Sequence, residues 1–497
     1  MMNDVAIPMP ASEEISAQQP HSSGNDISTS DALAQGFSAQ KSYFLQNTYP
    51  SYQARIDGLN KLKALLIDNQ QAFIDAMSKD FGHRSADDSK LGDILSTVMG
   101  INYTVKRLKR WMKKEKKHVG LLFQPAKAFV IYQPKGVIGI IAPWNYPVFL
   151  SLGPLTAALA AGNTAMIKMS EFTPNTTTLL AELISKNFAK EQVAIVSGDV
   201  KMAATFSALT FDHLFFTGST TVGRLVMKSA AENLVPVTLE LGGKSPTIID
   251  NDIDINTAVS RIILGKTLNS GQTCVAPDYI LCPKAKVESL VQALKTCYQD
   301  LYPTINNNVD CTSIINDGQK ARLDKLLNDA RGKGANITPL IAKTELADNT
   351  AQRKMPLTVI TNVRDDMLVM QEEIFGPLLP IIGYENINEA IDYVNKNARP
   401  LALYICSFNK DFQQDILLKT HAGGVCINDA AFHVANDDLP FGGIGASGMG
   451  QYHGVEGFKT FSHGKSVLSR GRISFTSLLF PPFGKKIHQL VYKLFIR

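Results

Sequence analysis

Residues 129–147 read FVIYQPKGVIGIIAPWNYP, and their pattern is the clearest indication of the fold class. Its short apolar runs are separated by Gly and Pro turns, which is typical of buried strands. Similar runs recur downstream, at residues 164–170, 192–198, 213–219 and 236–243. Helical stretches such as residues 174–188 and 220–232 lie between them. Strands alternating with helices predict βαβ units, a parallel sheet and therefore an α/β fold.

A second series of short apolar runs follows in the other half of the chain. They are YILCP, PLTVITNV, LLPIIGY and LALYICSF, at residues 279–283, 356–363, 378–384 and 401–408. A length of 497 residues favours two or three domains. We therefore expect two α/β domains of similar size with the active site between them.

Composition and charge exclude several classes of protein. Hydrophobic residues make up 45% and charged residues 19%, with a net charge of +5, which is an ordinary globular balance. The charge gives no reason to expect a nucleic acid as partner. The densest basic run, KRLKRWMKKEKKH at residues 106–118, fits either an anionic docking patch or, as we prefer, a solvated helix face.

Cysteine usage and hydropathy bear on the compartment. The six cysteines include no CxxC pair, which argues against a disulfide framework or a zinc site and favours a reducing compartment. We find no apolar run long enough for a transmembrane helix and no secretory signal pattern. These features predict a cytoplasmic protein. Residues 1–40 contain no Lys or Arg and are rich in Ser, Ala and Gln, so we expect a mobile tail there.

Three residues form the candidate catalytic set. Cys274 lies in NSGQTCVAPDY, a turn-like stretch that sets it apart from the other cysteines, although a lone cysteine is more often inert packing. Glu240, in VTLELGGKSPTII, ends a strand before two glycines and suits a general base, unless it is a helix cap or salt-bridge residue. Asn145 lies between two prolines in APWNYP and suits a rigid oxyanion donor, or simply a turn.

Other motifs point to a nucleotide cofactor. FTGSTTVG places Gly218 and Gly223 between a strand and a helix, where a helix N-terminus can bind phosphate, but it lacks the GxGxxG fingerprint. Lys168 and Glu171 follow another strand and could bind ribose hydroxyls.

Five motifs, in this order, resemble those of the aldehyde dehydrogenase superfamily: PWNYP, LELGGKSP, GQTC, EEIFGP and LPFGGIGASGMG. The resemblance extends from about residue 41 to about residue 465 and is closest to the branch of coniferyl-aldehyde, class 3 and fatty-aldehyde dehydrogenases. AAFHVANDDLPFGG, with Phe432 and His433, is most similar to the coniferyl-aldehyde members.

The resemblance assigns catalytic roles. It implies that Cys274 is the nucleophile that forms a thiohemiacetal and then a thioester. Asn145 and the Cys274 backbone N–H would stabilise the oxyanion, and Glu240 would activate the hydrolytic water. The product would be a carboxylic acid, from an aromatic aldehyde such as coniferyl aldehyde or from a medium- or long-chain aliphatic one.

The resemblance also implies how NAD is bound, with NADP as a second candidate cofactor. Lys168 and Glu171 would hold the adenosine ribose, and Ser219 would lie near the pyrophosphate with Trp144 close by. Glu373 would hold the nicotinamide ribose, and Phe375 would pack near its ring. Glu171 favours NAD because a carboxylate repels a 2′-phosphate.

The same resemblance predicts the domain organisation. It implies a doubly wound NAD(P)-binding domain at 41–111 and 131–243 and a catalytic domain at 244–455. A bridging element for oligomerisation would comprise 112–130 and 456–475, so we expect a homodimer or a higher homo-oligomer. The basic, apolar tail at 476–497 is expected to pack over the partner subunit or the substrate entrance, with peripheral membrane contact as the less favoured alternative.

Two other functions remain to be distinguished. A CoA-acylating aldehyde dehydrogenase would use the same thioester, but Glu240 favours hydrolysis. A catalytically inactive structural relative would keep the fold, but the presence of Cys274, Glu240 and Asn145 speaks against it.

Overall fold

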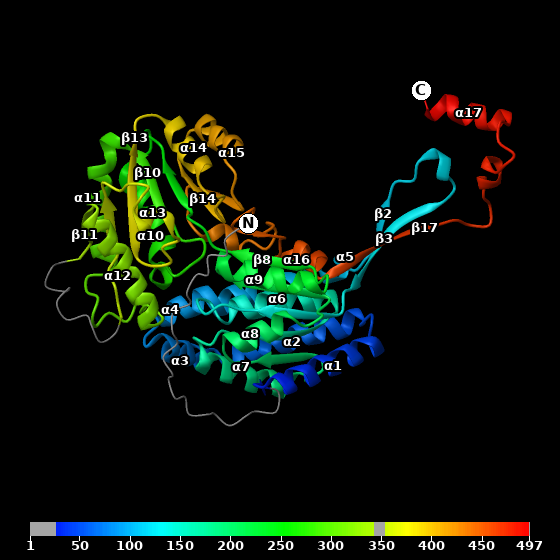
Figure 1. Ribbon diagram of the computed structural model, residues 1–497, viewed down its shortest axis with the longest axis horizontal. Coiled ribbons are helices and arrows are strands. Elements are labelled where there is room, and N and C mark those ends of the chain that lie inside the picture. Colours follow the sequence, from blue (N-terminus) through cyan, green and yellow to red (C-terminus); the bar gives the residue numbers. More distant parts are fainter. Residues whose placement is uncertain (1–25, 342–352, 497) are drawn as a thin grey trace, which may run out of the picture.

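The computed structural model describes residues 26–341 and 353–496, which form two large α/β bodies and a projecting arm (Figure 1). Each body is built around a seven-stranded sheet, and the arm around a three-stranded one. The α/β prediction is therefore confirmed.

The first sheet has the doubly wound topology. Its strand order is β1-β6-β5-β4-β7-β8-β16, and all of its pairs are parallel except β8 with β16. The strands are β1 (Asp26–Ile27), β4 (Val137–Ile141), β5 (Thr164–Lys168), β6 (Val193–Val196), β7 (His213–Gly218), β8 (Val237–Leu241) and β16 (Gly448–Met449). Strand order reverses between β4 and β7, and ligands of open α/β sheets bind at such a switch point.

Both faces of this sheet are covered by helices, which explains its nearly continuous apolar strands. Ile138 and Ile140 of β4 pack toward α2, α5, α6 and α7, whereas Val137 and Ile141 pack toward α1, α8 and α9. The helices of this body are α1 (Ser30–Gln46), α2 (Tyr52–Asp68), α3 (Gln70–Phe81), α4 (Ala86–Ser89), α5 (Ser96–Trp111), α6 (Phe149–Ala161), α7 (Pro174–Asn187), α8 (Val200–Ser207), α9 (Thr220–Glu232) and α16 (Gly454–Thr460). A π-helical segment, Lys90–Leu95, joins α4 to α5.

The second sheet has the order β11-β12-β13-β10-β9-β14-β15 and is parallel except for β11. Its strands are β9 (Pro246–Ile249), β10 (Tyr279–Pro283), β11 (Asn336–Pro339), β12 (Thr358–Thr361), β13 (Leu378–Tyr384), β14 (Ala402–Cys406) and β15 (Gly424–Ile427). Its helices are α10 (Ile255–Thr267), α11 (Val287–Leu301), α12 (Asp317–Gly332), α13 (Leu368–Gln371), α14 (Ile387–Lys396) and α15 (Lys410–Lys419). Two buried apolar clusters, one on each side, make up its core.

The arm consists of β2 (Glu115–Lys117), β3 (Lys127–Pro134) and β17 (Ser462–Ser469), all paired antiparallel, and it projects from the first body (Figure 1). The chain continues past β17 to α17 (Lys486–Phe495), which lies beyond the arm in the same view. Apolar side chains are exposed at both places: Leu121 at the hairpin tip is 74% exposed and Ile473 after β17 is 65% exposed. Among the described residues, no helix is long and apolar enough to cross a membrane.

Three expectations from the sequence need correction. The mobile tail is wrong for residues 26–40: β1 pairs with β6, and Leu33 of α1 is fully buried against the first sheet. Residues 1–25 of that tail lie outside the described residues. Most basic side chains of the run 106–118 are exposed, while Leu108 and Trp111 are buried, and the run is a helix only as far as Trp111 and becomes strand β2 at Glu115–Lys117.

The third correction concerns the domain boundary at residue 455. Gly448 of β16 pairs with Glu240 of β8, so this segment belongs to the first sheet. A side chain at Gly448 would overlap the Leu239 carbonyl, and its φ of +143° also favours glycine.

Candidate active site

A cavity of about 940 Å³ opens beside the switch point of the first sheet and reaches the second body. Residues from both bodies line it, so this cavity lies where the sequence predicts the active site. Eight of the eleven residues predicted for the site line the cavity: Trp144, Asn145, Gly218, Ser219, Glu240, Cys274, Glu373 and Phe375.

The topology explains why residues far apart in the sequence meet here. Trp144 and Asn145 follow the carboxyl end of β4, and Ser219 follows that of β7, the two strands at the switch point. Glu240 lies near the carboxyl end of β8, the next strand of the sheet.

Cys274 is held by an unusual backbone turn. Asn269, Ser270 and Gly271, just before it, all have positive φ angles, of 53°, 54° and 72°. Such a run is costly for residues other than glycine and needs support from its surroundings. Cys274 is a free, half-buried thiol. Burial, with contributions from the nearby Glu373 and Glu240, raises its pKa to about 12, so the thiol is neutral at pH 7 in this state.

The Asn145 amide is fixed by the same turn. Its side chain is 2% exposed, and its Nδ2 donates to the Gln272 carbonyl over 3.1 Å. The Asn145 carbonyl in turn accepts from Asn269 Nδ2 at 3.0 Å. An amide has two N–H donors, so one remains for a ligand in the cavity. Asn145 therefore has the fixed geometry that an oxyanion donor needs.

Glu240 is a buried carboxyl group without a local partner. Neither carboxyl oxygen has a hydrogen-bond partner among the described residues. Burial raises its pKa well above the ordinary value, because a buried site favours the neutral form of the acid. Buried polar groups are nearly always paired, and an exception in a cavity indicates a catalytic or ligand-binding role.

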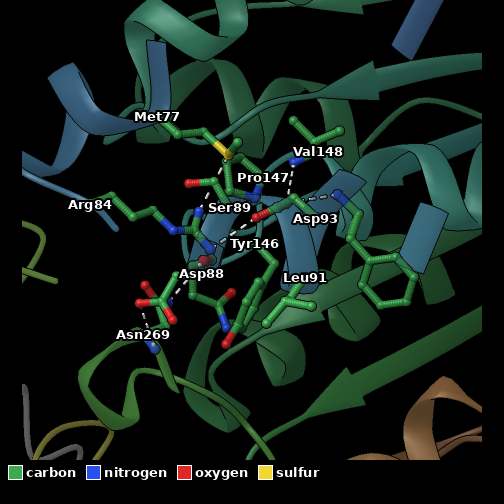
Figure 2. Close-up of polar contacts among 12 residues, drawn as sticks. Met77, Arg84, Asp88, Ser89, Leu91, Asp93, Tyr146, Pro147, Val148 and Asn269 are labelled. Carbon is green, nitrogen blue, oxygen red and sulfur yellow. Dashed lines mark hydrogen bonds and ion pairs between the residues drawn. The ribbon is translucent and has the colours of Figure 1, made fainter. Parts of the chain in front are cut away.

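A buried polar network contacts the segment that carries Asn145 and the turn that precedes Cys274 (Figure 2). Arg84 forms an ion pair with Asp93 at 2.9 Å, with both side chains fully buried. Asp93 Oδ1 accepts from the backbone N–H groups of Val148 and Phe149 at 2.9 Å, at the start of α6. These contacts fix the segment that carries Asn145.

Asp88, in the same network, supports the cysteine turn. One of its oxygens accepts from the Asn269 backbone N–H at 3.1 Å (Figure 2). Gln272 adds a second support, because its Oε1 accepts from the Ile315 N–H and its Nε2 donates to the Ser313 carbonyl, both at 3.0 Å. Sequence reasoning missed these residues. Asp88 lies in no motif, while Gln272 stands inside GQTC and could have been found there.

Glu373 and Phe375 face the cavity from the segment before β13. The Glu373 carboxylate lies against Gly242, where any side chain would overlap it, and it is bonded to the Gly243 N–H. Burial, with a contribution from Asp278, raises its pKa to about 8. Phe375 packs edge-on against Trp144, with ring centroids 5.3 Å apart.

The remaining predicted cofactor residues lie outside this cavity. Lys168 is buried and donates to the Met169 carbonyl at 2.7 Å, and burial lowers its pKa while Glu171 opposes that shift. Glu171 is exposed just past the end of β5. Gly223 faces Leu241 instead of open space, so it allows α9 to pack closely on the sheet. Its predicted contact with the cofactor has no support in this geometry.

The site suits a dinucleotide. Ser219 caps α9, accepting from the Val222 N–H at 3.3 Å, and the first N–H groups of this helix lie beside the switch point. Helix N-termini at such positions bind phosphate. Glu373, with no lysine or arginine ion pair of its own among the described residues, is a suitable acceptor for ribose hydroxyls.

Comparison with known proteins gives the family. The model of the aldehyde dehydrogenase family matches residues 3–467, so this chain belongs to that family. It is 52% identical over 475 residues to the "Probable coniferyl aldehyde dehydrogenase" of Pseudomonas aeruginosa, covering 96% of this chain and 98% of that one.

Solved structures of aldehyde dehydrogenases are similar to this chain as well. "Substrate bound state of Staphylococcus Aureus AldH" has a TM-score of 0.87 and 37% identity, covering 94% of this chain and 99% of that one. An aldehyde dehydrogenase of Mycobacterium tuberculosis, complexed with NAD+, has a TM-score of 0.80 and 26% identity over 90% of this chain and 92% of that one. The chain is an aldehyde dehydrogenase that uses NAD(P), so the predicted enzyme class, reaction and cofactor are confirmed.

Proposed function

We propose that this enzyme oxidises an aromatic aldehyde of the coniferyl type to its acid, with NAD, through a thioester on Cys274. The observation that carries the proposal is that Cys274, Asn145 and the unpartnered carboxyl group of Glu240 line one cavity. The coniferyl aldehyde named for the Pseudomonas aeruginosa relative supports the substrate class. Medium- and long-chain aliphatic aldehydes are the second candidate class.

In the first half of the reaction, Cys274 passes its thiol proton to water in the cavity, and the Sγ thiolate attacks the aldehyde carbon. The carbonyl oxygen becomes an alkoxide that accepts hydrogen bonds from Asn145 Nδ2 and from the Cys274 backbone N–H. NAD(P), when bound, supplies the acceptor for the hydride that leaves the thiohemiacetal carbon, which leaves a thioester on Cys274.

In the second half, Glu240 removes a proton from a water molecule, and the resulting hydroxide attacks the thioester carbon. The C–S bond breaks, the acid leaves and Cys274 is regenerated. Glu240 must be ionised for this step. Because burial raises its pKa, the base form becomes populated only as the pH rises.

We assign the cofactor contacts to this chain's own residues. Ser219 and the start of α9 would hold the pyrophosphate, with Trp144 close by. Lys168 and Glu171 would hold the adenosine ribose, and Glu373 the nicotinamide ribose with Phe375 near the ring. The exposed carboxylate of Glu171 favours NAD over NADP.

We further propose that the first body, 41–111 and 131–243, is the NAD(P)-binding domain and that 244–455, apart from β16, is catalytic. The arm would join two copies into a homodimer, and the tail at 476–497 would pack on the partner. The exposed apolar residues of the arm and tail support this, because such patches mark interaction surfaces. The six free cysteines support a cytoplasmic location.

A direct test compares the wild type with Cys274→Ala, using coniferyl aldehyde and decanal with NAD. We expect NADH and the acid from the wild type, and at least a thousandfold loss of turnover in the variant with NAD binding intact. Cys297→Ala, at another half-buried free thiol, is the matched control and should keep its activity. A Cys274→Ala variant with more than a few per cent activity contradicts the proposal, and acyl-CoA formation when CoA is added favours the CoA-acylating alternative.

A further inference from the structure

His453 is a polar residue of the active cavity that the reaction above does not use. It lines the cavity and is 8% exposed, and neither ring nitrogen has a hydrogen-bond partner among the described residues. A buried polar group without a partner is costly, so it persists where a ligand satisfies it.

Aromatic packing fixes the position of this imidazole. It stacks on Phe441, with centroids 5.1 Å apart and planes at 16°, and meets Tyr452 edge-on at 4.3 Å. Tyr452 lies close to the reacting groups, since Glu240 and Cys274 both contribute to the raised pKa of its hydroxyl, after burial. The His453 ring therefore lies in the same cavity wall, one aromatic side chain removed from the reacting groups.

The backbone at His453 is strained. Its φ of +86° and ψ of 141° lie in a region that is nearly exclusive to glycine. The next position, Gly454, accommodates only glycine, because a side chain there would overlap the Asp437 carbonyl. A strained, bulky residue at a cavity wall indicates that the position of its side chain matters for function.

The chemistry of the ring matches a neutral hydrogen-bonding ligand. Burial, with a contribution from His433, lowers the pKa of His453 to about 4, so the ring is neutral at pH 7. A neutral imidazole offers one donor and one acceptor. The same cavity is also lined by large apolar side chains, which suit a flat or aliphatic body: Leu91, Leu95, Met99, Phe149, Phe432 and Val434.

We propose that His453 is a specificity-determining residue that hydrogen-bonds a hydroxyl or ether oxygen of the aldehyde, remote from its carbonyl. The preferred substrates are then phenolic or alkoxy-substituted aromatic aldehydes. This inference rests on the proposed aldehyde oxidation, and it adds the residue that distinguishes substituted from unsubstituted substrates. A site built to pair a substrate hydroxyl discriminates against analogues that lack it, because its own polar group is then left unpaired.

The test measures kcat/KM for coniferyl aldehyde and for cinnamaldehyde, which lacks the hydroxyl and methoxy groups. One net hydrogen bond corresponds to about a tenfold effect. We expect the wild type to prefer coniferyl aldehyde by about tenfold. His453→Phe, which keeps the aromatic stacking, should lower kcat/KM about tenfold for coniferyl aldehyde, mainly through KM, and leave cinnamaldehyde within about twofold.

Two further variants complete the design. His453→Gln keeps a donor and an acceptor and should retain part of the preference for coniferyl aldehyde. His421→Phe makes the same substitution at an exposed histidine and should leave kcat/KM unchanged for both substrates.

Equal losses on both substrates in His453→Phe, or a wild type without preference, would overturn the assignment. The wild-type ratio does so even if the variant does not fold. Absence of NADH formation with every aldehyde would instead overturn the proposed function.

Discussion

Asn145→Ala separates the oxyanion role of this residue from its structural role. Asn145 Nδ2 carries two N–H groups, of which one donates to the Gln272 carbonyl and the other is available to an oxyanion. The variant loses both. Losing a single oxyanion donor lowers kcat by about 10²- to 10³-fold, or roughly 3–4 kcal/mol of transition-state stabilisation. We therefore expect a fall of that size in single-turnover NADH formation.

The cost to folding should be much smaller. The Gln272 carbonyl loses Asn145 Nδ2 as a donor but still accepts from Asn269 Nδ2 at 3.3 Å. The variant thus loses a hydrogen bond without leaving that carbonyl unsatisfied, which costs about 1 kcal/mol. Urea unfolding at fixed protein concentration measures this loss.

Asn163→Ala is the matched control, because Asn163 is equally buried but does not line the active cavity. Its side chain accepts from the Gly136 N–H at 2.9 Å and donates to the carbonyls of Ala158 and Phe461 at 3.1 and 2.9 Å. This control should lose more stability, about 3 kcal/mol, but keep kcat within about twofold. An Asn145→Ala variant that keeps more than a tenth of wild-type kcat would refute the oxyanion assignment.

Three further predictions follow from the site and the arm. Glu240→Gln should retain a burst of NADH but deacylate slowly. It should also lose the rise of kcat with pH, because the raised pKa of Glu240 means that its base form becomes more populated as the pH increases. Stopped-flow measurements check this, and a pH profile of kcat unchanged from the wild type speaks against the role of Glu240 as a base. The same substitution should make the protein relatively more stable as pH rises above about 4.5, because the acid ionises freely in the unfolded wild type while burial keeps it protonated in the folded one. Glu171→Gln should raise kcat/KM for NADP about fivefold, about 1 kcal/mol of repulsion, and a wild type that prefers NADP contradicts the assignment. A chain ending at Val467 should lose dimer by analytical ultracentrifugation if the tail packs on the partner; loss of binding to anionic liposomes with the dimer intact supports the membrane alternative.

The sequence was sufficient for the parts of the site that follow strands. Buried parallel strands have a distinct apolar pattern, and the end of β8 therefore predicted Glu240, whereas two flanking prolines predicted Asn145 and the family resemblance implied Ser219. The motif around Cys274 was equally visible. Short motifs in the sequence mark the positions of these candidate residues.

Residues that act through long-range packing were not predictable. Asp88 and Asp93 support the two catalytic loops from a π-helical segment and its neighbour, and charged residues in such a stretch look like an ordinary exposed face. The sequence also failed to predict that residues 26–40 form part of strand β1 and helix α1 instead of a mobile tail. There a few apolar contacts, such as that of Leu33, and the hydrogen bonds of Gln40 to the Ala165 and Lys190 carbonyls outweigh a polar composition.

The most direct test of the proposed mechanism is to trap the thioester on Cys274. Glu240→Gln, mixed with coniferyl aldehyde and NAD and quenched in acid within the burst, should carry one acyl group per active site. Peptide mass spectrometry should locate it on Cys274, at the mass of the thioester. An acyl group on another cysteine, or NADH formed in the burst without any acylated peptide, would contradict the mechanism.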